Sequence, residues 1–157
     1  RRKIHSDPFS LPDSSPMPRA DFYLIDKDRF RAQPLLLVCE LARKAYAASQ
    51  PLLVLARDSA QAEALDDLLW SFDPDEYLPH QIAGMDEDDD EAPILIATPD
   101  MDVPARPLLL NLRDDPPAGR FERVLEVVPA DPAARGPLRE RWKHFQAVGF
   151  EVNKHDM

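Results

Sequence analysis

Five short apolar runs along the chain predict the strands of one β-sheet. Each run is rich in the β-branched, aliphatic or aromatic residues that strands favour. The run PLLVLA is apolar throughout, which predicts a strand buried on both faces. The five predicted strands are residues 21–25, 51–56, 94–97, 108–112 and 124–128.

Apolar residues at helical spacing predict helices after the first, second and fifth of these strands. In residues 33–48 the apolar positions nearly surround the helix, so we expect it to be well buried. Asp58, with Gln61 three residues later, has the pattern of a capping box and predicts a helix that ends near Trp70. Asp131, followed by a proline, predicts the start of the last helix.

This order of elements predicts an α/β fold, a three-layer sandwich around a mostly parallel five-stranded sheet. The gap between the third and fourth strands is too short for a crossover helix, so the sheet can be mixed, with one part antiparallel. Residues 1–16 lack apolar periodicity and are rich in proline, serine and charge, which predicts a disordered extension. Residues 17–157 are then expected to form a single domain.

The last predicted helix carries two neighbouring stripes of side chains. The apolar stripe consists of Leu138, Trp142, Phe145 and Gly149. The basic stripe consists of Arg135, Arg139 and Lys143, at positions i, i+4 and i+8. Spacing alone favours a core face beside a solvated face. However, the chain has 29 acidic and 19 basic residues, so a purely basic stripe stands out and suits a ligand that is both acidic and aromatic.

A second group of aromatic residues lies around the end of the second predicted helix. Trp70 ends that helix, and Phe72, Tyr77 and Leu78 follow within a few residues. One interpretation places these side chains in the core under the sheet. The other leaves the aromatic side chains exposed as anchors for a partner protein.

Composition limits the functions that this chain can have. The net charge of −10 argues against binding nucleic acid by this chain alone, because phosphate binding rests on a cationic surface. Cys39 is the single cysteine, so no disulfide can form within the chain, as expected in a reducing cytoplasm, and Cys39 is predicted to be a small buried hydrophobe. No apolar run approaches the length of a membrane span, and no signal-peptide pattern is present.

Familiar catalytic and cofactor-binding motifs are also absent from the sequence. The four glycines are isolated, so there is no glycine-rich phosphate loop and no GxSxG. The four histidines have no metal-ligand spacing with each other or with Cys39, and His80 is predicted to be a structural hydrogen-bonding residue. The acidic run at residues 86–91 lacks the spacing and central glycine of a calcium loop and is predicted to be a solvated loop. We therefore expect no catalytic residue, metal or cofactor.

From about Arg19 to its end the sequence resembles the chi subunit of bacterial DNA polymerase III. The most specific part is the C-terminal block, which has VVP at residues 127–129, RERWK at 139–143, AVGF at 147–150 and Asn153. Further matching segments are FYL at 22–24, LVCELA at 37–42, Gln61, Ala62, Leu65, Asp66, Trp70, Pro79, His80, Ala83, Gly84 and NLR at 111–113. The sequence departs from the family in the N-terminal extension, in the acidic run and in the Gly136-Pro137 pair, which leaves the exact start of the last helix open.

The resemblance implies a cytoplasmic, non-catalytic accessory subunit of the polymerase holoenzyme, to which polymerisation itself belongs. Such a subunit binds the psi subunit of the clamp loader and the acidic, phenylalanine-ending C-terminal tail of single-stranded DNA-binding protein. By position, the family's tail site corresponds to Val128, Arg135, Arg139, Trp142 and Lys143. The psi-binding surface corresponds to Trp70 and Tyr77.

Two alternatives stay open at the level of sequence. One is a small-molecule or nucleotide-binding α/β enzyme domain, which a nucleotide bound to the purified protein would support. The other is an adaptor for a repair helicase, which would use the Trp70 surface and compete with psi.

Overall fold

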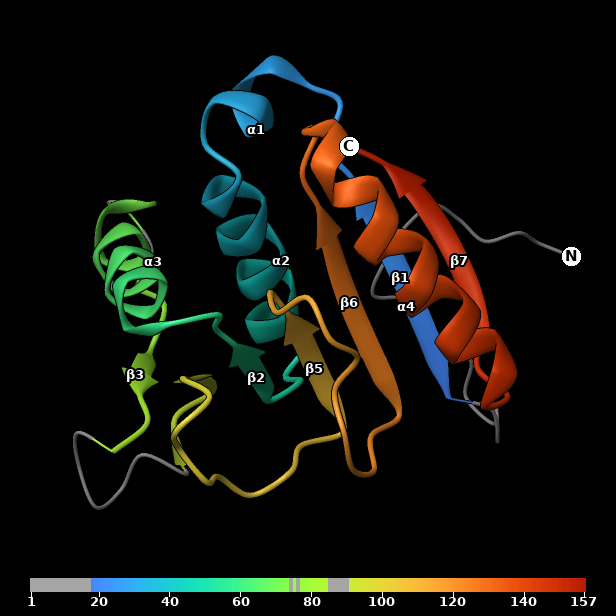
Figure 1. The fold of residues 1–157 in the computed structure, drawn as a ribbon. Helices are drawn as coiled ribbons and strands as arrows, with labels where there is room; N and C mark the ends of the chain where they lie inside the picture. The colour runs from blue at the N-terminus through green and yellow to red at the C-terminus, as the bar shows by residue number, and fades with distance from the viewer. Residues whose placement is uncertain (1–17, 74, 76, 85–90) are drawn as a thin grey trace, which may run out of the picture.

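Seven parallel strands form one sheet in the computed structural model, which describes residues 18–73, 75, 77–84 and 91–157 (Figure 1). The strand order is β3-β4-β2-β5-β6-β1-β7, and all six neighbouring pairs are parallel. The strands are β1 (Arg19–Leu24), β2 (Leu52–Leu55), β3 (His80–Ile82), β4 (Ile94–Ala97), β5 (Leu108–Asn111), β6 (Arg123–Val128) and β7 (Glu151–Asp156). The predicted disordered extension, residues 1–16, and most of the acidic run lie outside the described residues.

Five of these strands were predicted, and two corrections follow. The sheet has seven strands, because β3 and β7 also pair with it. The expectation that part of the sheet is antiparallel is wrong for the described residues, since β4 and β5 both lie parallel to β2. The connection at residues 98–107 needs no helix: about ten residues can span roughly 33 Å, well beyond the roughly 13 Å length of a four-residue strand.

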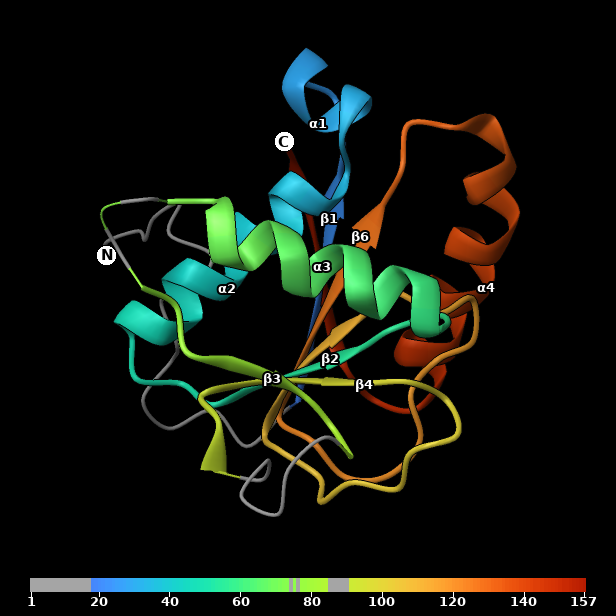
Figure 2. The same cartoon turned by 90° about the vertical axis from the view of Figure 1, so that its left-hand side faces the viewer.

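The helices lie on both faces of the sheet and form the outer layers. In Figure 2, α2 and α4 stand on opposite sides of the strands. The helices are α1 (Asp28–Ala32), α2 (Leu35–Ala47), α3 (Ser59–Ser71) and α4 (Arg135–Ala147), and a 3₁₀ turn, η2 (Pro132–Ala134), precedes α4. This arrangement confirms the three-layer α/β class. No helix among the described residues is long and apolar enough to cross a membrane.

The core consists of two clusters, one on each face of the sheet, because successive side chains of a strand point to opposite faces. Leu52 and Val54 of β2 belong to the cluster beneath α2 and α3. Leu53 and Leu55 belong to the cluster beneath Phe145 of α4. The prediction that β2 is buried on both faces is therefore confirmed. Cys39 is fully buried, as predicted.

Local hydrogen bonds explain where the helices begin and end. The carboxylate of Asp58 accepts from the backbone N–H of Gln61 at 2.8 Å, which confirms the predicted cap of α3. Asp131 accepts from the N–H of Ala133 and so caps η2, which places the start of α4 at Arg135. The inclusion of Gly149 in the apolar stripe is wrong, because it lies beyond the end of α4 with φ of +90° and turns the chain into β7.

Candidate functional site

A buried face of α4 fixes this helix against the sheet. Phe145 is fully buried, and its ring lies 6.0 Å from that of Phe22 on β1 and 5.1 Å from that of Phe150. Arg141 points to the same side, and its Nε donates to the buried carboxylate of Glu126 on β6 at 2.9 Å. Of the predicted apolar stripe, Phe145 therefore belongs to the hydrophobic core.

Glu126 is the acceptor around which the polar part of this contact is built. Asn111 at the end of β5 donates to its second carboxylate oxygen at 2.9 Å. Arg141 also donates to the backbone carbonyl of Asp114 at 3.2 Å. Burial raises the pKa of Glu126 to about 7, and the charge of Arg141 and the hydrogen bonds oppose that rise only in part. The network ties α4 to β6 and β5, so the exposed side of α4 has a set orientation.

A groove of about 240 Å³ lies on the exposed side of α4, and we call it the α4 groove. Its walls come from α4, from the end of β1 and from β7. The lining residues are Leu24, Leu138, Arg139, Trp142, Lys143 and Lys154. Trp142 is half-buried, with its ring 5.1 Å from that of Phe22, so the indole is held in place as one wall.

Three cationic side chains border the groove. They are Arg139, Lys143 and Lys154. All three residues are exposed, and within the described part of the chain none of them forms an ion pair. A groove with an apolar floor and unpaired cations at its rim can take a ligand that presents an apolar group beside carboxylates.

The structure brings together some of the residues predicted for this site. Arg139, Trp142 and Lys143 line the groove together, as their helical spacing predicts. Val128 does not line it, because its side chain is 3% exposed and belongs to the core beneath α4. Arg135 is exposed at the first position of α4, one turn before Arg139.

Sequence reasoning missed two lining residues, Leu24 and Lys154. Leu24 lies within the first predicted strand and is the last residue of β1. Its alternation with Phe22 indicates that both side chains face the same side of the sheet. Lys154 lies on β7 directly opposite Phe22 of β1. Because β7 reads EVNKHD and was not predicted as a strand, no sequence signal placed Lys154 beside α4.

A second surface feature is an exposed aromatic pair, which we call the aromatic patch and define as Trp70 and Tyr77. Their side chains are 58% and 61% exposed, and their ring centroids lie 5.4 Å apart. In contrast, Leu78 is buried and Phe72 packs against the core beneath α2 and α3. Phe72 and Leu78 are therefore core residues, whereas Trp70 and Tyr77 are exposed on the surface.

His80 supports the patch from below. Its ring is buried and lies 4.9 Å from the ring of Trp70 at an interplanar angle of 63°. Nδ1 donates to the carbonyl of Leu78 at 2.7 Å, and Nε2 lies 3.0 Å from the carboxylate of Asp66 on α3. These contacts confirm the predicted structural role of His80. They also hold Trp70 in an exposed position.

The α4 groove and the aromatic patch lie on opposite sides of the molecule. The groove lies beside β1 and β7, whereas the patch lies at the end of α3 beside His80 of β3, at the other end of the strand order. Figure 1 shows α3 and α4 on either side of the central strands. Neither surface contains a nucleophile paired with a base. No group of His, Cys, Asp and Glu residues among the described residues is arranged to hold a metal ion.

Comparison with known proteins identifies relatives over most of the chain. Residues 17–153 match the family described as DNA polymerase III chi subunit, HolC. The DNA polymerase III subunit chi of Pseudomonas aeruginosa is 33% identical over 141 residues, which cover 88% of this chain and 96% of that protein. The subunit of the same name from Escherichia coli is 32% identical over 143 residues, covering 87% and 97%.

The chain is also similar in fold to parts of other solved structures. The C-terminal domain of the DEAD-box protein Dbp5 matches with a TM-score of 0.61 and 13% identity, over 89% of this chain and 91% of that one. T4 UvsW matches with a TM-score of 0.61 and 10% identity, over 89% of this chain and 41% of that one. At such low identity these matches report a shared fold and no shared activity.

Proposed function

This chain belongs to the DNA polymerase III chi subunit family, and from that premise we propose that it is a non-catalytic bridging subunit of the polymerase holoenzyme. It links the clamp loader, through the psi subunit, to the C-terminal tail of single-stranded DNA-binding protein. It works in the cytoplasm, where DNA replication takes place in bacteria. DNA-directed DNA polymerase activity belongs to the assembly.

The α4 groove is the observation that carries this proposal. The tail that the family binds is acidic and ends in phenylalanine, so it presents an aromatic ring beside an α-carboxylate. Leu24, Leu138 and Trp142 offer an apolar slot for the ring. Arg139 can bind the carboxylate with two parallel hydrogen bonds.

Other cations complete the site around this central contact. Lys143 and Lys154 lie at the rim and meet the aspartates of the tail more loosely. Arg135, one turn earlier on α4, extends the positive surface along the tail. Val128 acts from beneath the groove, as part of the core on which α4 packs.

The aromatic patch is the proposed contact with psi. Exposed aromatic side chains are the residue types most enriched among strong interface anchors. Trp70 and Tyr77 are both more than half exposed and already contact each other, so little ordering is required on binding. A repair helicase that binds this chain would use the same patch, and psi and the helicase would then compete.

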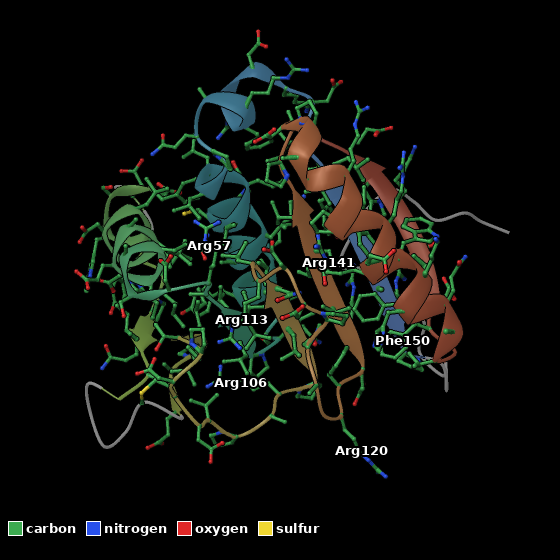
Figure 3. The ribbon with its side chains drawn as sticks, in the orientation of Figure 1. Arg57, Arg106, Arg113, Arg120, Arg141 and Phe150 are labelled. Carbon is green, nitrogen blue, oxygen red and sulfur yellow. The ribbon has the colours of Figure 1, made fainter. Side chains whose placement is uncertain are left out.

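A peptide titration tests the tail site. Isothermal calorimetry with the tail peptide should give saturable binding, and removal of its terminal phenylalanine should abolish most of it. Arg139→Ala should cost about 1.5–3 kcal/mol of binding free energy, the range for a hydrogen bond to a charged group. Arg120→Ala is the matched control, because Arg120 is exposed at a distance from α4 (Figure 3). Equal affinities for wild type and the Arg139 variant would place the site elsewhere.

A further inference from the structure

A cavity of about 510 Å³ lies at the carboxyl ends of β2, β5 and β6, and we call it the edge cavity. It is separate from the α4 groove, since no described residue lines both. The edge cavity is bounded by residues that follow β2 and β5 and by the first turns of α2, α3 and α4. Its volume lies in the range of about 300–1,000 Å³ that small-molecule sites occupy.

The topology of the sheet explains why a cavity forms at this place. β2 continues into α3 on one face, whereas β6 continues into α4 on the other face. β5 lies between these two strands and continues into a loop instead of a helix. Chains that leave neighbouring strands toward opposite faces open a crevice at the carboxyl edge, which is where parallel α/β sheets generally bind ligands.

Three arginines from different elements line the edge cavity. They are Arg57 after β2, Arg113 after β5 and Arg141 on α4. Figure 3 shows the three labels between α3 and α4. Arg141 is already engaged by Glu126 and by the backbone carbonyl of Asp114, so the guanidinium groups available to a ligand are those of Arg57 and Arg113.

Arg113 is a cation held at this edge without a carboxylate partner. Its Nε donates to the carbonyl of Ala56 at 2.9 Å, and its Nη2 donates to the carbonyl of Ala97 at 3.0 Å. Within the described part of the chain it forms no ion pair, and burial lowers the pKa of its guanidinium. A partly buried, unpaired charge gains from an anion brought beside it.

Arg57 is exposed and only weakly held. Its side chain is 61% exposed and forms an ion pair with Asp58, with 3.6 Å between Nε and the carboxylate. An exposed pair of this kind contributes little free energy, so the guanidinium can turn toward a ligand. One oxygen of Asp58 is already taken by the cap of α3. Asp114 is the other carboxylate of the lining, and it is exposed.

Much of the remaining lining is apolar. It includes Pro34, Leu35, Val38, Leu112, Val127 and Pro129. A bare inorganic anion would leave this surface without a partner. A ligand that carries an anionic group on an apolar or planar body would cover both parts.

We propose that the edge cavity binds a small organic phosphate, with the phosphate between Arg57 and Arg113 and the apolar body against the proline and aliphatic lining. A guanidinium presents paired N–H donors that match phosphate oxygens. This arrangement would replace the glycine-rich loop that the sequence lacks, because the donors come from side chains. The site requires neither the tail peptide nor psi.

Calorimetry on the full chain tests the proposal with four probes: inorganic phosphate, pyrophosphate, AMP and ADP. We expect saturable binding that is tightest for an organic phosphate. Arg57→Gln should weaken it by about tenfold or more, as loss of a charged hydrogen bond does. Arg120→Gln is the matched control and should leave binding unchanged, since Arg120 lies far from the cavity in Figure 3.

Further variants separate this site from the α4 groove. Arg139→Ala should weaken tail binding and leave phosphate binding intact. Arg113→Gln, with its melting temperature measured in parallel, should weaken phosphate binding while the protein stays folded. The proposal is overturned if no probe saturates at millimolar concentration, if Arg120→Gln weakens binding as much as Arg57→Gln, or if the acidic tail peptide displaces the phosphate.

Discussion

Lys154 illustrates how much a single residue of this site depends on tertiary structure. It lies on β7, whereas Arg139 and Lys143 lie on α4, yet all three residues line the same groove. Its partner in register on β1 is Phe22, whose ring packs on Trp142. Lys154 therefore adds a cation to the side of the groove opposite α4.

We expect Lys154→Ala to weaken tail-peptide binding by about 0.2–1 kcal/mol, the range for exposed ion pairs. The loss should be smaller than for Arg139→Ala, and it should shrink as salt rises, because the Debye length falls from about 10 Å at 0.1 M to about 3 Å at 1 M. Fluorescence anisotropy at two salt concentrations measures both effects. Lys44→Ala on α2 is the control, and an unchanged affinity for the Lys154 variant at low salt would remove this residue from the site.

Asp21 is the most highly connected charge in the core. It is fully buried, and it accepts from Arg19 at 3.0 Å, from Arg123 at 2.7 Å and from His155 at 3.0 Å. Burial alone would raise its pKa, but the hydrogen bonds from His155 and Arg19 and the charge of Arg123 lower it to about 2. These contacts join β1, β6 and β7 on the face away from α4.

Asp21→Asn should destabilise the protein by about 3 kcal/mol at neutral pH, because buried cations lose their counter-charge. The folded-state pKa lies below the ordinary value of 3.8, so the carboxylate contributes stability above pH 3.8 and loses it as pH falls through about 2. Urea unfolding at several pH values should show the gap between wild type and variant closing near pH 2. The exposed Asp67→Asn is the control, and a gap that stays constant with pH would contradict the assignment.

At the scale of elements, the end of α3 separates core from surface within a few residues. Phe72 packs against the core, whereas Trp70 and Tyr77 point outward. The sequence alone could not decide between these orientations, because aromatic residues serve equally well as core and as interface anchors. The contacts of His80 with Trp70 and Leu78 decide it.

Trp70→Ala should weaken psi binding by about 2 kcal/mol or more, as loss of a central aromatic anchor does. Its melting temperature should stay near that of wild type, since more than half of the side chain is exposed. Phe72→Ala should do the reverse, with a clear fall in melting temperature. Surface plasmon resonance and thermal unfolding measure the two effects. A large drop in melting temperature for the Trp70 variant would make Trp70 a core residue.

The elements that the sequence predicted are those that carry their own hydrophobic signal. β2 and β4 are apolar throughout, β5 is apolar except for Asn111, and α2 and α3 have clear apolar faces or caps. β7 is different, because its six residues are mostly polar and it exists as an edge strand only because β1 offers a parallel partner. β3 has three residues, too few for any pattern. The α4 groove was therefore predictable on its helical wall and missed on its β7 wall.

At the scale of the whole molecule, the sheet separates two surfaces with different chemistry. The α4 groove is cationic and lies beside β1 and β7, whereas the aromatic patch lies at the end of α3 near β3, at the other end of the strand order. The net charge of −10 repels an acidic tail from most other parts of the surface. A bridging subunit needs this separation, because both partners must fit at once.

We expect the tail peptide and psi to bind independently. Coupling between distant sites requires an element with two arrangements that both ligands bias. Here α4 is fixed to the sheet by Phe145 and by the Arg141–Glu126 pair, so psi at the aromatic patch has no evident way to move it. Calorimetric titration of the tail peptide should therefore give dissociation constants within about twofold with and without saturating psi, well below the tenfold change that 1.4 kcal/mol would produce.

The same experiment has an internal control for each surface. Arg139→Ala should weaken binding of the tail peptide and leave psi binding unchanged. Trp70→Ala should weaken psi binding and leave tail-peptide binding unchanged. Light scattering of wild type with both partners should give the mass of a complex that contains all three. A tail affinity that changes tenfold when psi is added would show that the sheet transmits a conformational change, and the rigid arrangement of α4 on β6 would then be wrong.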